Sequence, residues 1–214
     1  MDDFADRIEH TVLGPTTRWA DVAETLDEAI RYGMRACIPP CYLERGTEYA
    51  SGVDITTVVG FPHGQHPSET KCREAKQVWQ AGVAELDVVA NVGYVKAGEF
   101  EAVQSELEEV VATVPIPVKV IVEAPLLDES ELREVCAVAA DADVDYLKTA
   151  TGFSEGGATV ADVELMSEYA PVKASGGIGS LSFARELIDA GAERIGASSG
   201  DDIIEEYENA ENGT

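Results

Sequence analysis

Positive charge is scarce in this chain. Its 214 residues include 15 lysines and arginines against 41 aspartates and glutamates, which gives a formal net charge of -26. Nucleic acids and anionic membranes bind proteins through lysine and arginine, so neither is an expected partner. The acidic residues are spread over expected helix faces and the C-terminus, which is typical of a solvated surface. Because salt screens repulsion between like charges, we expect a protein from a salt-rich cytoplasm.

Cysteine and long apolar runs are also scarce. The four cysteines, Cys37, Cys41, Cys72 and Cys136, form neither a CxxC motif nor a dense disulfide framework. The acidic N-terminus, residues 1–6, lacks the basic and apolar regions of a signal peptide. No apolar run reaches the ~18 residues that a membrane span needs. We therefore expect a soluble protein of the reducing cytoplasm.

Short apolar runs alternate with longer amphipathic ones along the chain. The short runs are rich in Val and Ile, as parallel strands covered by helices are. The long ones place apolar residues on one helical face, as Val22, Leu26 and Ile30 do, and Gly33 marks the end of that helix. The expected strands are 7–11, 34–38, 54–60, 85–90, 118–123, 145–149, 171–174 and 193–197. The expected helices are 21–30, 68–81, 99–111, 129–139, 160–169 and 181–190.

This alternation predicts an α/β protein, a (β/α)8 barrel in a single domain over residues 1–214. An acidic C-terminal helix and tail are expected over about 201–214. A doubly wound open sheet alternates in the same way. It is disfavoured because no G-x-G-x-x-G turn follows the first expected strand.

Two lysines end neighbouring expected strands. Lys148, one of only six lysines, leads from an apolar strand into a Thr/Gly-rich loop, and Lys173 occupies the equivalent place in the next strand. Burial and a nearby like charge both disfavour the ammonium form, so part of Lys148 is expected as free amine, which attacks carbonyl groups. The alternative is that either lysine pairs with an acid or caps a helix. The pattern indicates Schiff-base chemistry.

Further polar residues fall near the carboxyl ends of expected strands, where barrel enzymes carry their catalytic groups. Asp87 is a lone acid among apolar neighbours, which suits a proton shuttle acting through water. The alternative is a buried acid held by a structural lysine. Thr11 and Cys37 lie at similar strand ends. Lys119 comes early in its strand, so it is expected to form an ion pair or to support the site rather than to react.

Glycine-rich loops follow the seventh and eighth expected strands, at 174–179 and 195–200. Such loops, with a helix N-terminus, form the usual phosphate cradle of these barrels. Either loop alone could be a simple turn. Together they predict an anion site made of backbone dipoles and serine hydroxyls, which needs no basic patch.

No metal is expected. His63 and His66 lie in a proline-flanked loop and fall short of the ligand set of a zinc site, although an acid could complete one.

Several motifs, in order over nearly the whole chain, resemble the deoxyribose-phosphate aldolase family. The Lys-Thr-x-Thr-Gly block that starts at Lys148 and the Lys-x-x-Gly-Gly block that starts at Lys173 are together highly specific. Further matching blocks occupy 9–13, 37–40, 58–62, 71–74, 85–89, 119–123 and 194–199.

The resemblance implies a class I aldolase on a TIM barrel, without metal or cofactor. It would cleave 2-deoxy-D-ribose 5-phosphate reversibly to D-glyceraldehyde 3-phosphate and acetaldehyde, in deoxyribonucleotide breakdown, as a homo-oligomer. Lys148 would form the Schiff base, Lys173 would adjust its basicity and Asp87 would relay protons. Cys37 matches a family cysteine near the site; the alternative is a small core residue. The substrate would lie against Thr151, Gly152, Gly176, Gly177, Gly196, Ser198 and Ser199.

Three positions depart from the family pattern. Glu9 stands where the family usually has Asp, which keeps the carboxylate but changes its reach. Gly179 stands where many members carry a cation, so a positive charge is missing from the phosphate side. The chain ends soon after Tyr207, so no tail tyrosine is assigned to the site.

Three rival functions fit part of the sequence. An imine-forming aldolase for another phosphorylated sugar would differ in its turnover of donor aldehydes. A zinc-dependent aldolase would lose activity with a chelator. A non-catalytic sugar-phosphate-binding barrel would be stabilised by its ligand without forming an adduct at Lys148.

Overall fold

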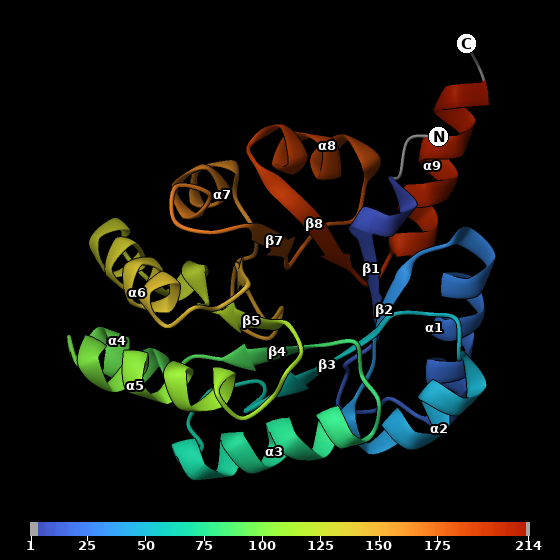
Figure 1. The fold of residues 1–214 in the computed structure, drawn as a ribbon. Helices are drawn as coiled ribbons and strands as arrows, with labels where there is room; N and C mark the ends of the chain where they lie inside the picture. The colour runs from blue at the N-terminus through green and yellow to red at the C-terminus, as the bar shows by residue number, and fades with distance from the viewer. Residues whose placement is uncertain (1–3, 213–214) are drawn as a thin grey trace.

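The computed structural model describes residues 4–212, in which eight parallel strands form a closed barrel. The strands follow one another around the barrel in chain order, and β1 pairs with β8 to close it. Figure 1 shows this barrel within a ring of helices. The predicted (β/α)8 barrel is therefore confirmed. The strands are β1 Ile8–Thr11, β2 Arg35–Cys37, β3 Ile55–Val59, β4 Glu85–Val89, β5 Val118–Ile121, β6 Tyr146–Lys148, β7 Val172–Ser175 and β8 Ala192–Ala197.

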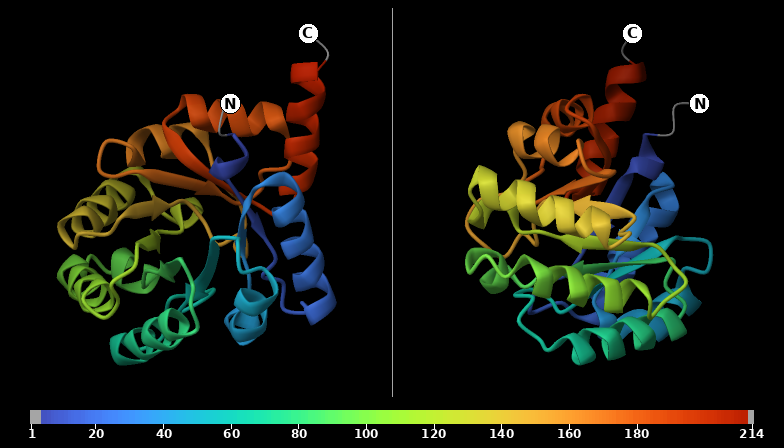
Figure 2. Two further views of the ribbon diagram at one scale, coloured as in Figure 1. Left: turned by 45° about the vertical axis from the view of Figure 1, so that its right-hand side comes forward. Right: turned by 60° about the vertical axis from the view of Figure 1, so that its left-hand side comes forward.

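Helices cover the outside of the barrel, as the two turned views in Figure 2 show. Short 3-10 helices cover Ala5–Arg7, Pro40–Tyr42 and Ala124–Leu126. The α-helices are α1 Trp19–Tyr32, α2 Leu43–Tyr49, α3 Ser68–Gln80, α4 Val92–Lys96, α5 Phe100–Val111, α6 Glu129–Asp141, α7 Val160–Met166, α8 Leu181–Asp189 and α9 Gly200–Asn212.

Helix α1 shows how the apolar pattern directs packing. Val22, Leu26 and Ala29 are buried against the barrel, and Gly33 ends the helix with φ 70°, as expected. The prediction that Ile30 belongs to the buried stripe is wrong, because its side chain is 54% exposed. Ala29, three residues after Leu26, completes the stripe instead.

Helices α2 and α4 were not among the expected helices. Each is short, seven residues in α2 and five in α4, so neither spans enough turns to give a readable period. Gly46 in the middle of α2 further weakens the helical signal. Because both helices fill connections between strands, their omission leaves the barrel order unchanged.

Two stretches at the ends lie outside the described residues. These are 1–3, part of the acidic N-terminus considered above, and 213–214, the end of the expected tail. The rest of that tail, up to 212, belongs to α9. No helix within residues 4–212 has the length and apolar character to cross a membrane.

Candidate active site

Three lysines surround one carboxylate inside the barrel. Lys148 and Lys173 donate to the same oxygen of Asp87, Oδ2, at 2.7 and 2.9 Å, and Lys119 donates to the other, Oδ1, at 3.0 Å. Strand pairing creates this arrangement, because Asp87 lies beside Lys119 in the register and Lys148 lies beside Lys173. All four residues are at most 3% exposed. The sequence predicted that Lys119 would pair, and it does.

A second carboxylate, Glu9, joins this cluster from β1. Glu9 accepts a hydrogen bond from Lys173, a contact that the sequence alone does not determine. Its other oxygen, Oε2, lies 3.7 Å from Lys119 and has no hydrogen-bond partner among the described residues. A third carboxylate, Glu85, binds Lys119 and also Arg194. Among the described residues, this cluster therefore contains three carboxylates, three lysines and Arg194.

The ion pairs fix the protonation of this cluster. Burial would raise the pKa of Asp87, but the charges of Lys119, Lys148 and Lys173 hold it well below its usual range. Burial would likewise lower the pKa of Lys173, but Asp87 and Glu9 raise it above its usual range. Asp87 is thus a carboxylate and Lys173 an ammonium ion at neutral pH.

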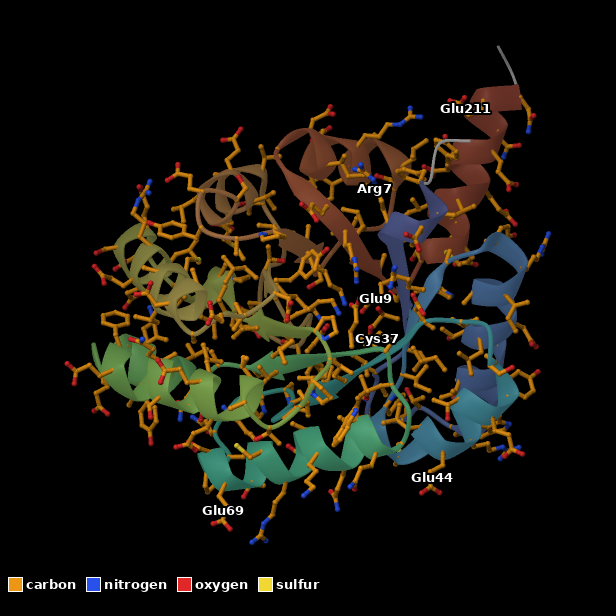
Figure 3. The ribbon with its side chains drawn as sticks, in the orientation of Figure 1. Arg7, Glu9, Cys37, Glu44, Glu69 and Glu211 are labelled. Atoms are coloured by element: carbon orange, nitrogen blue, oxygen red, sulfur yellow. The ribbon has the colours of Figure 1, made fainter. Side chains whose placement is uncertain are left out.

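A cavity of about 450 Å³ opens above this cluster. Lys148 lines it, whereas Asp87, Lys173 and Glu9 lie beneath and are not among its lining residues. Figure 3 shows Glu9 near the centre of the barrel and Glu69 on its outer side. The residues predicted from sequence that line the cavity are Thr11, Lys148, Thr151, Gly152, Gly176, Gly177, Gly196, Ser198 and Ser199.

The cavity also has lining residues that were not singled out individually from the sequence, although four of them belong to the predicted loops 174–179 and 195–200. They are the loop after β1, one aromatic ring, and residues between the predicted glycines. Their common signal is position, since each follows or ends a strand at the carboxyl end of the barrel. They are Leu13, Gly14, Phe153, Ser175, Ile178, Gly179 and Ala197.

Gly196 leaves the space that the aliphatic part of the Lys173 side chain occupies. A Cβ atom at Gly196 would lie 2.9 Å from Lys173 Cε and 3.2 Å from Ser175 Cβ. Any larger residue at this position would therefore push the Lys173 ammonium away from its carboxylates.

Cys37 lies in the interior, close to Glu9 and Asp87. Burial raises the pKa of the Cys37 thiol to about 12, so it is a neutral thiol. Donor atoms of these three residues lie within 4.8 Å of one another, a composition that could hold a metal. Both carboxylates, however, already bind lysine ammonium groups. This favours the alternative that Cys37 fills space in the core.

Glu123 is a polar residue at the carboxyl end of β5 that the sequence did not assign to the site. Its backbone is left-handed, with φ 58° and ψ 52°, which costs energy for a residue other than glycine. Its buried carboxylate accepts hydrogen bonds from Thr151 N–H at 3.2 Å and from the Ser154 hydroxyl at 2.8 Å. Glu123 therefore fixes the loop that brings Thr151 to the cavity.

Two other sequence features lie away from the cavity. His66 Nδ1 is 3.6 Å from Glu74, and neither His63 nor His66 belongs to a group of metal-ligand type within residues 4–212. The ring of Tyr207 stacks on Phe4 with centroids 4.5 Å apart.

Comparison with known proteins places the chain in a family. The DeoC/LacD family aldolase profile matches residues 8–206. The deoxyribose-phosphate aldolase of the archaeon Haloarcula marismortui is 62% identical over 208 residues, covering 97% of this chain and 90% of that protein. Among solved structures, the aldolase QR15 has a TM-score of 0.95 at 33% identity, with 99% of each chain covered. The deoxyribose phosphate aldolase of Aeropyrum pernix, whose structure is tetrameric, has a TM-score of 0.90 at 36% identity, covering 97% of this chain and 92% of its own. With its barrel, its buried lysines and these matches, the chain belongs to the DeoC/LacD family of aldolases.

Proposed function

We propose that this protein is a class I aldolase that reversibly cleaves 2-deoxy-D-ribose 5-phosphate to D-glyceraldehyde 3-phosphate and acetaldehyde. The observation that carries the proposal is Lys148, an amine at the floor of the cavity whose neighbours already balance one another's charge. The family match and the names of the relatives support the same activity.

The chemistry begins with free-amine Lys148. Its Nζ attacks C1 of the open-chain sugar, and loss of water from the carbinolamine gives an iminium ion. Removal of the proton from the C3 hydroxyl lets the C2–C3 bond break, so its electron pair enters the iminium and forms an enamine. Glyceraldehyde 3-phosphate leaves, C2 takes up a proton, and hydrolysis of the iminium releases acetaldehyde and regenerates Lys148.

Charge balance explains how Lys148 can become a free amine. The three carboxylates of Asp87, Glu9 and Glu85 lie against three cations other than Lys148, which are Lys119, Lys173 and Arg194. When Lys148 releases its proton, no carboxylate is left buried without a cation. Asp87, 2.7 Å from Lys148, is the group placed to relay protons through a water.

Backbone dipoles and hydroxyls serve as the phosphate site. Gly176 and Gly177 follow β7, and Ser198 and Ser199 lead into the N-terminus of α9. Among the described residues that line the cavity, Lys148 is the one that carries a charge. A phosphate would therefore be held by N–H groups, serine hydroxyls and the helix dipole, as helix N-termini can do.

We also propose that residues 1–214 act as one cytoplasmic aldolase domain and assemble into a homo-oligomer. The tetrameric structure of the Aeropyrum pernix relative supports an oligomer. Two large apolar side chains, Ile30 and Tyr49, are 54% and 48% exposed and line one surface hollow. Light scattering in molar KCl tests this part, and a mass of 22.8 kDa would contradict it.

Cleavage assays test the proposed reaction. Purified protein in molar KCl is given 2-deoxyribose 5-phosphate, other sugar phosphates, and each with and without a chelator, while released acetaldehyde is measured. The proposal expects fastest release from 2-deoxyribose 5-phosphate and no effect of the chelator. A different preferred sugar would favour the other imine-forming aldolase, and inactivation by the chelator would favour the zinc enzyme. No turnover with ligand-dependent stabilisation would favour a binding protein.

A further inference from the structure

A buried histidine connects strand β1 with the start of α9. His10 is 3% exposed and lies between Glu9 and Thr11, so it points outward from the barrel. Its Nε2 atom is 2.7 Å from the Glu28 carboxylate on α1, and its Nδ1 atom is 3.2 Å from the backbone nitrogen of Gly200. One imidazole ring thus joins a strand, a helix and the beginning of another helix.

The two contacts determine the tautomer of the ring. The Gly200 N–H can only donate, so Nδ1 must be the unprotonated nitrogen that accepts. The ring proton then sits on Nε2 and is donated to Glu28. Glu28 therefore holds His10 in the single tautomer that can accept from Gly200.

This contact lies next to the cavity. Gly200 is the first residue of α9 and follows Ser198 and Ser199, which line the cavity. The fit is close, because a Cβ atom on Gly200 would lie 2.8 Å from His10 Nδ1. β1 also carries His10 beside Ala197 of β8 in the register. The ring thus defines where the turn 198–200 stands relative to the barrel.

We propose that His10 and Glu28 are positioning residues that set the affinity of the turn 198–200 for the phosphate group of the substrate. The inference rests on the proposed function, because it assigns this turn to phosphate binding. Shifts of about 1 Å at such a site weaken binding or catalysis strongly, so a fixed helix start keeps the N–H groups aimed at one point. Neither side chain touches the substrate.

Variants of His10 and Glu28 test the proposal. His10→Leu removes the acceptor, whereas His10→Asn offers Oδ1 near the place of Nδ1 and serves as the conservative rescue. Glu28→Gln removes the carboxylate that fixes the tautomer, and Glu24→Gln, an exposed glutamate on the same helix, is the matched control. Steady-state cleavage of 2-deoxyribose 5-phosphate and of unphosphorylated 2-deoxyribose is measured, together with inhibition by inorganic phosphate.

His10→Leu should raise the KM for the phosphorylated sugar and the inhibition constant of phosphate by about tenfold, the usual effect of one lost hydrogen bond. Cleavage of unphosphorylated 2-deoxyribose should change by less than about twofold. His10→Asn should restore most of the affinity. The KM and the inhibition constant of Glu28→Gln should lie between those of His10→Leu and those of the wild-type protein. Equal losses on both sugars, or an unchanged inhibition constant for phosphate, would overturn the proposal.

Two further measurements isolate the role of the hydrogen bond between His10 and Gly200. If the wild-type protein cleaves neither sugar, the proposed function fails, and calorimetric titration with inorganic phosphate still tests the His10 variants. Asp201 has a carboxylate oxygen within 4.8 Å of the facing atoms of His10 and Glu28, so the phosphate measurements are repeated with a chelator. Unchanged values support the direct hydrogen bond. A chelator effect that matches His10→Leu would show a cation in its place and overturn the proposal.

Discussion

Lys148 and Lys173 share one oxygen atom, Asp87 Oδ2, at 2.7 and 2.9 Å. Two ammonium groups on one oxygen repel each other, and Lys173 is held more firmly because it also contacts Glu9. Lys148 is the lysine of this pair that lines the cavity. The site therefore places Lys173, which two carboxylates hold, beneath Lys148, which one carboxylate holds and which faces the cavity.

Replacing Asp87 by asparagine should disable the enzyme and weaken the fold. The variant leaves three lysines without their shared carboxylate, and removal of one partner of a buried ion pair costs about 3–5 kcal/mol. Loss of the proton relay should lower kcat by roughly 10²–10⁴-fold. The measurements are kcat and urea unfolding in molar KCl, with Glu101→Gln as a surface control for the charge change. A kcat within threefold of the wild-type value would contradict the assigned role.

Replacing Glu123 by glutamine should loosen the loop at Thr151. The two carboxylate oxygens accept hydrogen bonds from the Thr151 N–H and the Ser154 hydroxyl. The glutamine amide has only one oxygen, and its NH₂ group can only donate. We expect the KM for 2-deoxyribose 5-phosphate to rise by about tenfold, with a smaller rise in Ser154→Ala, which loses one bond. The check is steady-state kinetics of the two variants. A larger effect from Ser154→Ala than from Glu123→Gln would contradict this account.

The ionisation of Glu85 should make the free energy of unfolding depend on pH. Burial would raise the pKa of Glu85, but Lys119 and Arg194 lower it from 4.5 to about 2. A carboxylate with a lower pKa in the folded state stabilises the fold fully above its unfolded value, and this stabilisation is lost as the pH falls through the folded value. The free energy of unfolding of the wild-type protein should therefore be larger than that of Glu85→Gln by about 2–3 kcal/mol at pH 6. This difference should disappear as the pH falls from 4.5 to 2. Unfolding at a series of pH values tests this, and a constant gap would refute it.

Salt should stabilise the protein strongly. A net charge of -26 produces self-repulsion in dilute buffer, and the Debye length falls from ~30 Å at 0.01 M to ~3 Å at 1 M salt. The 62% identity to a protein from a halophilic archaeon agrees with this expectation. The melting temperature should rise steadily from 0.01 M to molar KCl, to about the same extent with NaCl. Equal melting temperatures at both salt concentrations would mean that the acidic surface has another purpose.

Much of this architecture could be predicted from the sequence because it depends on local patterns. Runs of Val and Ile between amphipathic stretches predicted the strands and their order, and strand ends predicted which residues would meet. Lys148, Lys173 and Asp87 were found because charges in apolar strands are costly and therefore conspicuous.

The remaining features depend on contacts between distant residues. The pairing of Glu9 with Lys173 spans 164 positions, and His10 meets Gly200 across 190. No spacing along the chain encodes these contacts, which arise only when β1 closes against β8. Glu123 was not assigned to the site because its role depends on a left-handed backbone conformation, which a glutamate in the sequence does not predict.

The most direct test of the central claim is trapping with borohydride. The protein in molar KCl is treated with 2-deoxyribose 5-phosphate and sodium borohydride, then analysed by intact mass and peptide mapping. The account predicts a substrate-dependent adduct on Lys148, none on Lys173 or Lys119, and none in Lys148→Met. Folded protein that gives no adduct, or an adduct on Lys173, would contradict it.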